Sequence, residues 1–177
     1  MNDAKPTARV FSDPSSVTLL VLDVDGVLTD GSINIDDDGR ETKRFHVRDG
    51  YAMKLWMRKG YQLAIITGRS GSALEHRLDS LGIPEGMVIQ GSRDKSESLD
   101  VILGQSGCDE LHAAFMGDDW PDLPAIDRVG FPICPANAEA EVLERCALVT
   151  SRDGGQAAVR EAIAHLLKAK GEYFPGS

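Results

Sequence analysis

The sequence predicts a single α/β domain built on a doubly wound, mostly parallel sheet, with a projecting β-hairpin and no cap domain. Its length of 177 residues suits one domain. Short apolar runs typical of buried strands alternate along the chain with segments whose apolar residues recur at helical spacing, an order that indicates a parallel sheet. We expect the domain to span residues 17–170, between a flexible lead-in at residues 1–16 and a tail at residues 171–177.

The first strand is expected at residues 17–22, an apolar run that ends abruptly at Asp23. A β-hairpin is expected over residues 32–47, because apolar residues flank the turn sequence Asp-Asp-Asp-Gly at residues 36–39. The apolar residues of the hairpin are Ile33, Ile35, Phe45 and Val47. We interpret the aspartates of the turn as solvated residues rather than as a second metal site.

After the hairpin, Asp49 is expected to cap a helix that runs to Lys59 and stops at Gly60. Further strands are expected at residues 62–67, 87–90, 113–116, 131–133 and 148–150. Further helices are expected around Leu74, Leu78 and Leu81, around Leu99, Ile102 and Leu103, and over residues 123–129, 138–145 and 155–169.

Charge and composition argue against several classes of protein. The chain has 19 Lys and Arg against 28 Asp and Glu, and its formal charge of −9 disfavours nucleic acid and membrane as partners. No apolar run approaches the roughly 20 residues that span a bilayer, and residues 1–16 lack the apolar core of a signal peptide. The three cysteines form no Cys-x-x-Cys pair and fit reduced thiols, so we expect a cytoplasmic protein.

Polar residues that suit phosphate chemistry follow the predicted strands. In chain order they are Asp23 and Asp25, then Thr67, Gly68 and Arg69, then Lys95, and finally Asp118 and Asp119. Ligands of open parallel sheets bind beyond the carboxyl ends of the strands. We therefore expect these side chains to converge on one site.

This set of residues indicates phosphoryl transfer supported by a divalent cation. A cation such as Mg²⁺, held by Asp23 and Asp118, would neutralise phosphate charge and let a carboxylate nucleophile approach. Lys95 and the Thr67 hydroxyl, with the backbone N–H that follows it, would hold the other phosphate oxygens. Asp23 would then attack phosphorus, while Asp25 would protonate the leaving alcohol and later deprotonate water.

The sequence Val-Leu-Asp-Val-Asp-Gly-Val-Leu-Thr at residues 21–29 resembles the first motif of the haloacid dehalogenase-like (HAD) phosphatases, which have a Rossmann-like sheet. Thr67, Lys95 and Gly117-Asp118-Asp119 fall where that superfamily keeps its other three motifs. Within it, the chain is similar to the 3-deoxy-D-manno-octulosonate 8-phosphate (KDO 8-phosphate) phosphatases. The segments that carry this narrower resemblance are residues 45–51, 66–69, 90–95 and 154–161.

The resemblance implies a role for individual residues. Asp23 would be the nucleophile and Asp25 the acid/base. Mg²⁺ would bind the Asp23 carboxylate, the Asp25 backbone carbonyl and Asp118. The residues implied to surround the sugar phosphate are Arg48, Asp49, Gly50, Arg69, Arg77 and Lys95, besides Asp25, Thr67 and Gly68.

Some of these residues keep a second interpretation. Asp-x-Asp-Gly also opens an EF-hand calcium loop, but the preceding β-run and the missing flanking helix argue against one. Asp119 and Asp122 either orient Lys95 and metal-bound water or cap the next helix. Arg48 and Arg77 either contact substrate or are solvated surface charges.

The spacing of the motifs leaves no room for a cap domain. Between Asp25 and Thr67 lie 41 residues, and between Thr67 and Lys95 lie 27, which the predicted elements fill. A single subunit would leave its site open to water, and the apolar hairpin would need covering. Association of subunits would solve both problems, and the resemblance implies a homotetramer.

The leading hypothesis is a Mg²⁺-dependent phosphatase that converts KDO 8-phosphate into KDO and phosphate for lipopolysaccharide biosynthesis. The first alternative is a phosphatase for another keto-sugar acid, such as a nonulosonate 9-phosphate. The second is a non-catalytic HAD-fold interaction module, against which the complete set of predicted catalytic residues argues.

Overall fold

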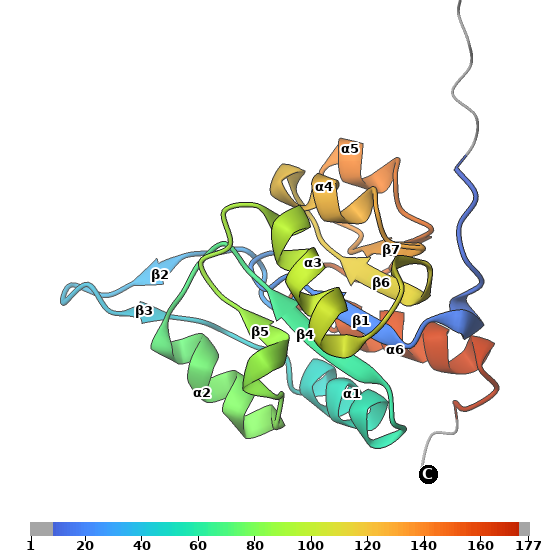
Figure 1. Ribbon diagram of the computed structural model, residues 1–177. Helices are drawn as coiled ribbons and strands as arrows, with labels where there is room; N and C mark the ends of the chain where they lie inside the picture. Colours follow the sequence, from blue (N-terminus) through green and yellow to red (C-terminus); the bar gives the residue numbers. More distant parts are fainter. Residues whose placement is uncertain (1–8, 174–177) are drawn as a thin grey trace, which may run out of the picture.

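The computed structural model describes residues 9–173, and its centre is a six-stranded sheet (Figure 1). All six strands are parallel and lie in the order β5-β4-β1-β6-β7-β8. Their bounds are β1 (Leu19–Leu22), β4 (Gln62–Ile66), β5 (Val88–Ile89), β6 (Ala113–Met116), β7 (Phe131–Cys134) and β8 (Leu148–Val149). Because the order runs outward from β1 in both directions, the sheet is doubly wound, as the sequence predicts.

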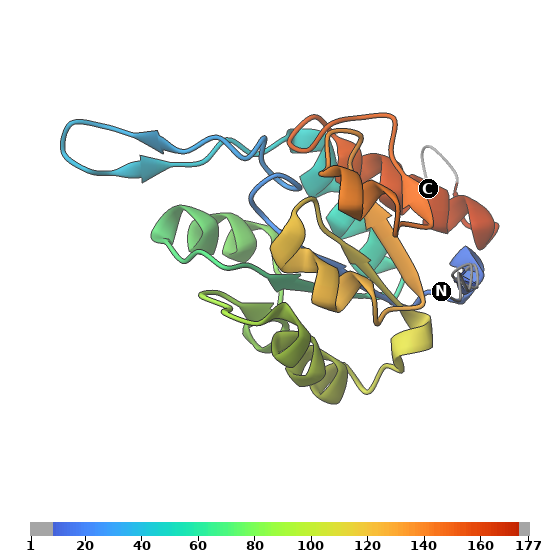
Figure 2. The same cartoon turned by 90° about the horizontal axis from the view of Figure 1, so that it is seen from above.

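Helices cover both faces of this sheet (Figures 1 and 2). They are α1 (Val47–Arg58), α2 (Ser72–Leu81), α3 (Lys95–Ser106), α4 (Leu123–Ile126), α5 (Ala140–Leu143) and α6 (Ala158–Ala169). Leu20 and Leu22 of β1 pack in one apolar cluster with α1, α2 and α6, whereas Leu19 and Val21 pack in a second with α3, α4 and α5. This alternation is the two-residue period of a strand, and covering on both faces goes with strands that are apolar except for the exposed Gln62 at the start of β4.

Part of the expected lead-in packs against the domain. The Arg9 guanidinium donates to the backbone carbonyls of Ile126 and Val129 at 2.9 and 2.6 Å. A 3₁₀ turn, η1 (Pro14–Ser16), leads into β1. The other 3₁₀ turns are η2 (Glu85–Met87), η3 (Glu110–His112) and η4 (Trp120–Asp122). Residues 1–8 of the lead-in and 174–177 of the tail lie outside the described residues.

The predicted hairpin extends far from the sheet (Figure 2). Its ladder is shorter than expected, because only β2 (Asn34–Ile35) and β3 (Glu41–Thr42) pair in antiparallel register. The turn between them is closed by Asp36, whose Oδ1 accepts the backbone N–H groups of Asp38 and Arg40. The aspartate run thus includes turn-forming residues, and Val47 belongs to α1 rather than to the hairpin.

The prediction that Asp49 caps α1 is wrong. The N-cap is His46, whose Nδ1 accepts the backbone N–H of Arg48 at 3.1 Å. Asp49 is buried in the first turn of α1, and its Oδ1 accepts the backbone N–H of Arg160 at 2.7 Å. Since Arg160 lies in the first turn of α6, Asp49 caps that helix across a tertiary contact.

Within residues 9–173 no cap domain interrupts the motifs. The hairpin and α1 fill the chain between β1 and β4, and α2, η2 and β5 fill the chain between β4 and α3. In that same part of the chain, no helix has both the length and the apolar character needed to cross a membrane.

Candidate active site

The predicted catalytic residues meet at the carboxyl edge of the sheet, as expected for this topology. Asp23 follows β1 directly, Thr67 follows β4, and Asp118 lies two residues beyond β6. They line a cavity of about 470 Å³. The predicted site residues on this cavity are Asp23, Asp25, Thr67, Gly68, Arg69, Lys95, Asp118, Asp119 and Asp122.

Lys95 joins two carboxylates in the floor of the cavity. Its ammonium lies 2.9 Å from Oδ1 of Asp23 and also donates to Oδ1 of Asp122. Lys95 is the first residue of α3, and the N-cap Asp94 fixes that end by accepting the backbone N–H of Ser96 at 2.8 Å. The helix start therefore positions the buried lysine.

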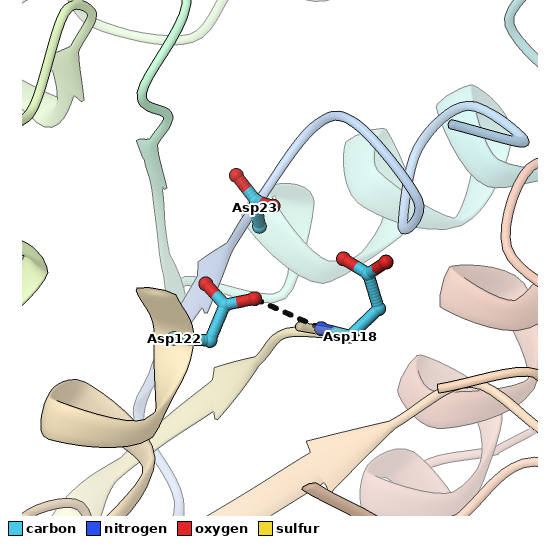
Figure 3. Close-up of side chains that lie close together, drawn as sticks. All are labelled: Asp23, Asp118 and Asp122. Atoms are coloured by element: carbon cyan, nitrogen blue, oxygen red, sulfur yellow. Dashed lines mark hydrogen bonds between the residues drawn. The ribbon is translucent and has the colours of Figure 1, made fainter. Parts of the chain in front are cut away.

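Asp122 holds the backbone that carries Asp118 (Figure 3). Its Oδ2 accepts the backbone N–H groups of Asp118 and Asp119 at 2.9 and 3.1 Å. Asp119 in turn caps η4 by accepting the Trp120 N–H at 2.7 Å. The sequence left two roles open for Asp119 and Asp122: capping the next helix, or orienting Lys95. Asp119 has the capping role, whereas Asp122 takes part in the cap and also binds Lys95.

A glycine allows the catalytic loop to approach Asp118. Gly26 has a φ of +91°, and a Cβ at this position would lie 1.9 Å from Oδ2 of Asp118. A Cβ at Gly154 would lie 1.7 Å from the Gly26 carbonyl oxygen. The backbone of residues 154–155 therefore packs directly against the loop after β1, an approach that a larger side chain would block. This segment thus has a structural role beside the site.

The carboxylates of the floor are electrostatically strained. Burial, together with the negative charge of Asp122, raises the pKa of Asp23 to about 7. Burial and the charges of Asp122 and Asp23 raise the pKa of Asp118 to about 8. Burial alone would lower the pKa of Lys95, but the Asp23 and Asp122 carboxylates raise it above its ordinary value. One ammonium does not balance three carboxylates, so the site favours further positive charge.

The donor set fits a divalent cation. Ligand atoms of Asp23, Asp118 and Asp122 lie within 4.8 Å of one another. Both Asp122 oxygens already accept hydrogen bonds, from backbone N–H groups and from Lys95. Oδ1 of Asp118, by contrast, is buried without a hydrogen-bond partner among the described residues. Asp23 and Asp118 are therefore the carboxylates that suit Mg²⁺, a cation that prefers oxygen ligands.

Two charged residues of the hairpin reach this site and were missed by the sequence analysis. Lys43 donates to Oδ1 of Asp25 and lies 3.1 Å from Glu41. Glu41 also accepts from Arg69. The available signal was the two-residue period of a strand, which places Glu41 and Lys43 on one side and the exposed Arg40 and Arg44 on the other.

Four predicted substrate residues lie outside the cavity of this chain. Asp49 caps α6, and a Cβ at Gly50 would lie 2.3 Å from Nη2 of Arg77. Arg77 also lies over the ring of Phe45, with its guanidinium carbon 5.7 Å from the centroid. Arg48 lines a separate groove beside α6. One chain thus brings the phosphate-handling residues together but not these four, whose contact with substrate stays a prediction.

Comparison with known proteins shows the family. No protein-family model matches the chain. The 3-deoxy-D-manno-octulosonate 8-phosphate phosphatase of Escherichia coli K12 is 37% identical over 166 residues, which cover 94% of this chain and 87% of the relative. The chain belongs to the KDO 8-phosphate phosphatase family.

Solved structures agree with this family. A HAD superfamily hydrolase of Legionella pneumophila is 39% identical with a TM-score of 0.88, over 90% of this chain and 87% of that one. The KDO 8-phosphate phosphatase of Moraxella catarrhalis, in complex with magnesium, phosphate and KDO, is 38% identical with a TM-score of 0.86, over 90% of each chain. The predicted HAD fold, a Rossmann-like sheet with no cap domain over residues 9–173, is confirmed.

Proposed function

We propose that this member of the KDO 8-phosphate phosphatase family hydrolyses KDO 8-phosphate to KDO and phosphate through an aspartyl-phosphate on Asp23. The observation that carries the proposal is the buried Asp23 carboxylate, held against Lys95 and beside Asp118 at the carboxyl edge of the sheet. The relatives support the substrate, because the Moraxella catarrhalis structure contains KDO, phosphate and magnesium.

In the first half of the reaction, a carboxylate oxygen of Asp23 attacks phosphorus. The bond between phosphorus and the sugar oxygen breaks, and Asp25 gives a proton to the departing oxygen. Lys95 and the Thr67 hydroxyl bind the non-bridging phosphate oxygens, and the backbone N–H of Gly68 adds a third donor. Burial of Thr67 and Lys95 strengthens these interactions, because little water competes for the donors.

In the second half, water attacks the aspartyl-phosphate. Asp25 accepts a proton from the attacking water, the bond between phosphorus and Asp23 breaks, and inorganic phosphate leaves. Asp23, Asp118 and the Asp25 backbone carbonyl would hold Mg²⁺. When bound, this cation supplies positive charge that the three floor carboxylates require and that lowers the repulsion between Asp23 and a phosphate dianion.

The substrate class fits the distribution of positive charge. Lys95 serves the phosphate end, and Arg69, which lies on the cavity, provides a guanidinium suited to a carboxylate. Arg48 and Arg77 would join the site from a neighbouring copy if the chain forms the homotetramer that we propose. A nonulosonate 9-phosphate carries the same two charged ends, so it remains the alternative substrate.

We also place the chain in the cytoplasm, within lipopolysaccharide biosynthesis. Free cysteines at positions 108, 134 and 146 support a reducing compartment.

Phosphate release from a panel of sugar phosphates tests the substrate, and Asp23→Asn tests the chemistry. KDO 8-phosphate should give the highest kcat/KM, ahead of a nonulosonate 9-phosphate and a neutral hexose phosphate. Asp23→Asn should fold and show no turnover, since an amide forms no aspartyl-phosphate. Turnover by that variant at the wild-type rate would contradict the mechanism. A folded wild-type chain without phosphatase activity would favour the interaction module.

A further inference from the structure

We infer that Lys43 is a positioning residue for the acid/base Asp25, and that the second strand of the hairpin belongs to the active site of its own chain. The inference rests on the proposed function, because it assigns a role within that reaction. Lys43 does not line the cavity itself, so it acts through the carboxylate that it holds.

The two oxygens of Asp25 have different surroundings. Oδ1 accepts a hydrogen bond from the Lys43 ammonium, whose side chain is only 7% exposed. Oδ2 is buried and has no hydrogen-bond partner within residues 9–173, and it lies 4.0 Å from Nε of Arg69. Lys43 therefore fixes the carboxylate by one oxygen and leaves the other free to exchange a proton with the leaving group and with water.

Lys43 is itself held by a closed arrangement of alternating charges. It lies 3.1 Å from Oε1 of Glu41, and Oε2 of Glu41 accepts from the Arg69 guanidinium. Nε of Arg69 lies 4.0 Å from Oδ2 of Asp25, which completes the ring of four charged residues. Two of these four residues come from the hairpin, one from the loop after β1 and one from the loop after β4.

This arrangement has a physical reason to be specific. A nearly buried ammonium costs free energy unless carboxylates compensate it, and Lys43 has two. Each of these side chains therefore limits the positions open to its partners, and the rotamer of Asp25 depends on where the second strand of the hairpin, with Glu41 and Lys43, lies. Misplacement of a catalytic group by about 1 Å can cost roughly 10²-fold in rate. A hairpin that moves would thus change the rate without touching the substrate.

Lys43→Met, which keeps an unbranched side chain one atom shorter and removes its charge, tests the inference. At saturating Mg²⁺, kcat for KDO 8-phosphate should fall by roughly 10–100-fold, part of the roughly 10²–10⁴-fold that acid/base catalysis contributes, while KM changes little. Lys43→Arg should recover part of the loss. The matched control is Arg44→Met, the next cation on the hairpin, which is 73% exposed and should leave kcat unchanged.

The decisive measurement repeats Lys43→Met in an Asp25→Asn background, with single-turnover rates. If Lys43 acts through Asp25, the second change causes no further loss. If Lys43 instead binds substrate or only stabilises the fold, the two losses multiply, and that result overturns the inference. Wild-type kcat in a folded Lys43→Met chain overturns it as well.

A second variant keeps the test sharp if Lys43→Met fails to fold. Glu41→Gln keeps the side-chain volume and removes one carboxylate from Lys43, so it should lower kcat. With a phosphate ester that has no carboxylate, KM should not rise. Equal kcat in Glu41→Gln and wild type would then overturn the inference. Failure of the proposed function has a different signature, because the wild-type chain itself would release no phosphate from any sugar phosphate.

Discussion

Asp122→Asn is the most informative single change in the floor of the site. Asp122 is 1% exposed and accepts three hydrogen bonds, from the Asp118 and Asp119 backbone N–H groups and from the Lys95 ammonium. Asparagine has the same shape but only one acceptor oxygen. Whichever way its amide turns, an amino group faces either the two backbone donors or the ammonium.

The size of the effect follows from this mismatch. Loss of a hydrogen bond to a charged group costs about 1.5–3 kcal/mol, which is roughly 10- to 150-fold in a rate or binding constant. The lost hydrogen bond would otherwise hold Asp118 or Lys95 in position, and both residues contact phosphate or cation in the proposed mechanism. We therefore expect kcat/KM to fall by roughly that factor, with a higher Mg²⁺ concentration for half-maximal activity.

The assay is phosphate release against Mg²⁺ concentration, with thermal unfolding as a check of the fold. Asp119→Asn is the matched control, because Asp119 is exposed and its side chain caps η4, a task that asparagine performs equally well. Asp119→Asn should retain the wild-type Mg²⁺ response. An Asp122→Asn chain as active as wild type, or equal losses in both variants, would refute the assignment of Asp122 as the residue that organises the floor.

Three further predictions follow from the geometry. Chelation should abolish activity reversibly, and Asp118→Ala should weaken Mg²⁺ binding measured by calorimetry, because Oδ1 of Asp118 has no other partner among the described residues. Burial raises the pKa of Asp49 from 3.8 to about 6, so the folded chain retains a proton that the unfolded chain loses. As pH rises from about 4 to 6, Asp49→Asn should gain about 2 kcal/mol of unfolding free energy over wild type in urea titrations. Ile33→Asp, at an exposed hairpin position, should dissociate the proposed tetramer in light scattering and lower activity with it.

The strands of the sheet were predictable because burial on both faces makes them apolar runs bounded by polar residues. β6 spans Ala113–Met116 as predicted, four other strands lie within the predicted ranges, and β7 extends one residue beyond its range, to Cys134. The phosphate-handling residues were predictable for a related reason. A residue that directly follows a parallel strand is carried to one known edge of the sheet, so its approximate place follows from the topology.

Residues whose positions depend on side-chain direction were not predictable in this way. The resemblance implies substrate contacts for Asp49 and Arg77, which stay predictions; within this chain the Asp49 carboxylate accepts from α6, and Arg77 lies against Gly50 and Phe45. Spacing along a helix fixes the face on which a residue lies but not which neighbouring element that face meets. Lys43 was missed because a charged residue in a hairpin is normally solvated. The two-residue period places Lys43 on the side opposite to Arg40 and Arg44, but it does not identify the buried partner 18 residues earlier in the chain.

The hairpin connects two properties that the sequence suggested separately. Its first strand exposes Ile33 and Ile35, which are 58% and 62% accessible in one chain. Its second strand places Lys43 and Glu41 on the acid/base Asp25 and on Arg69, and Ile35 lies directly opposite Glu41 in the ladder. A two-strand ladder of this length has little stability of its own, so contacts made by the exposed isoleucines affect how rigidly the facing strand holds Glu41 and Lys43. Because residues 9–173 contain no cap domain, covering of Ile33 and Ile35 by another subunit would both exclude water from the site and hold the acid/base in place. Dissociation would then lower kcat through the position of Asp25 and would change the binding of phosphate less.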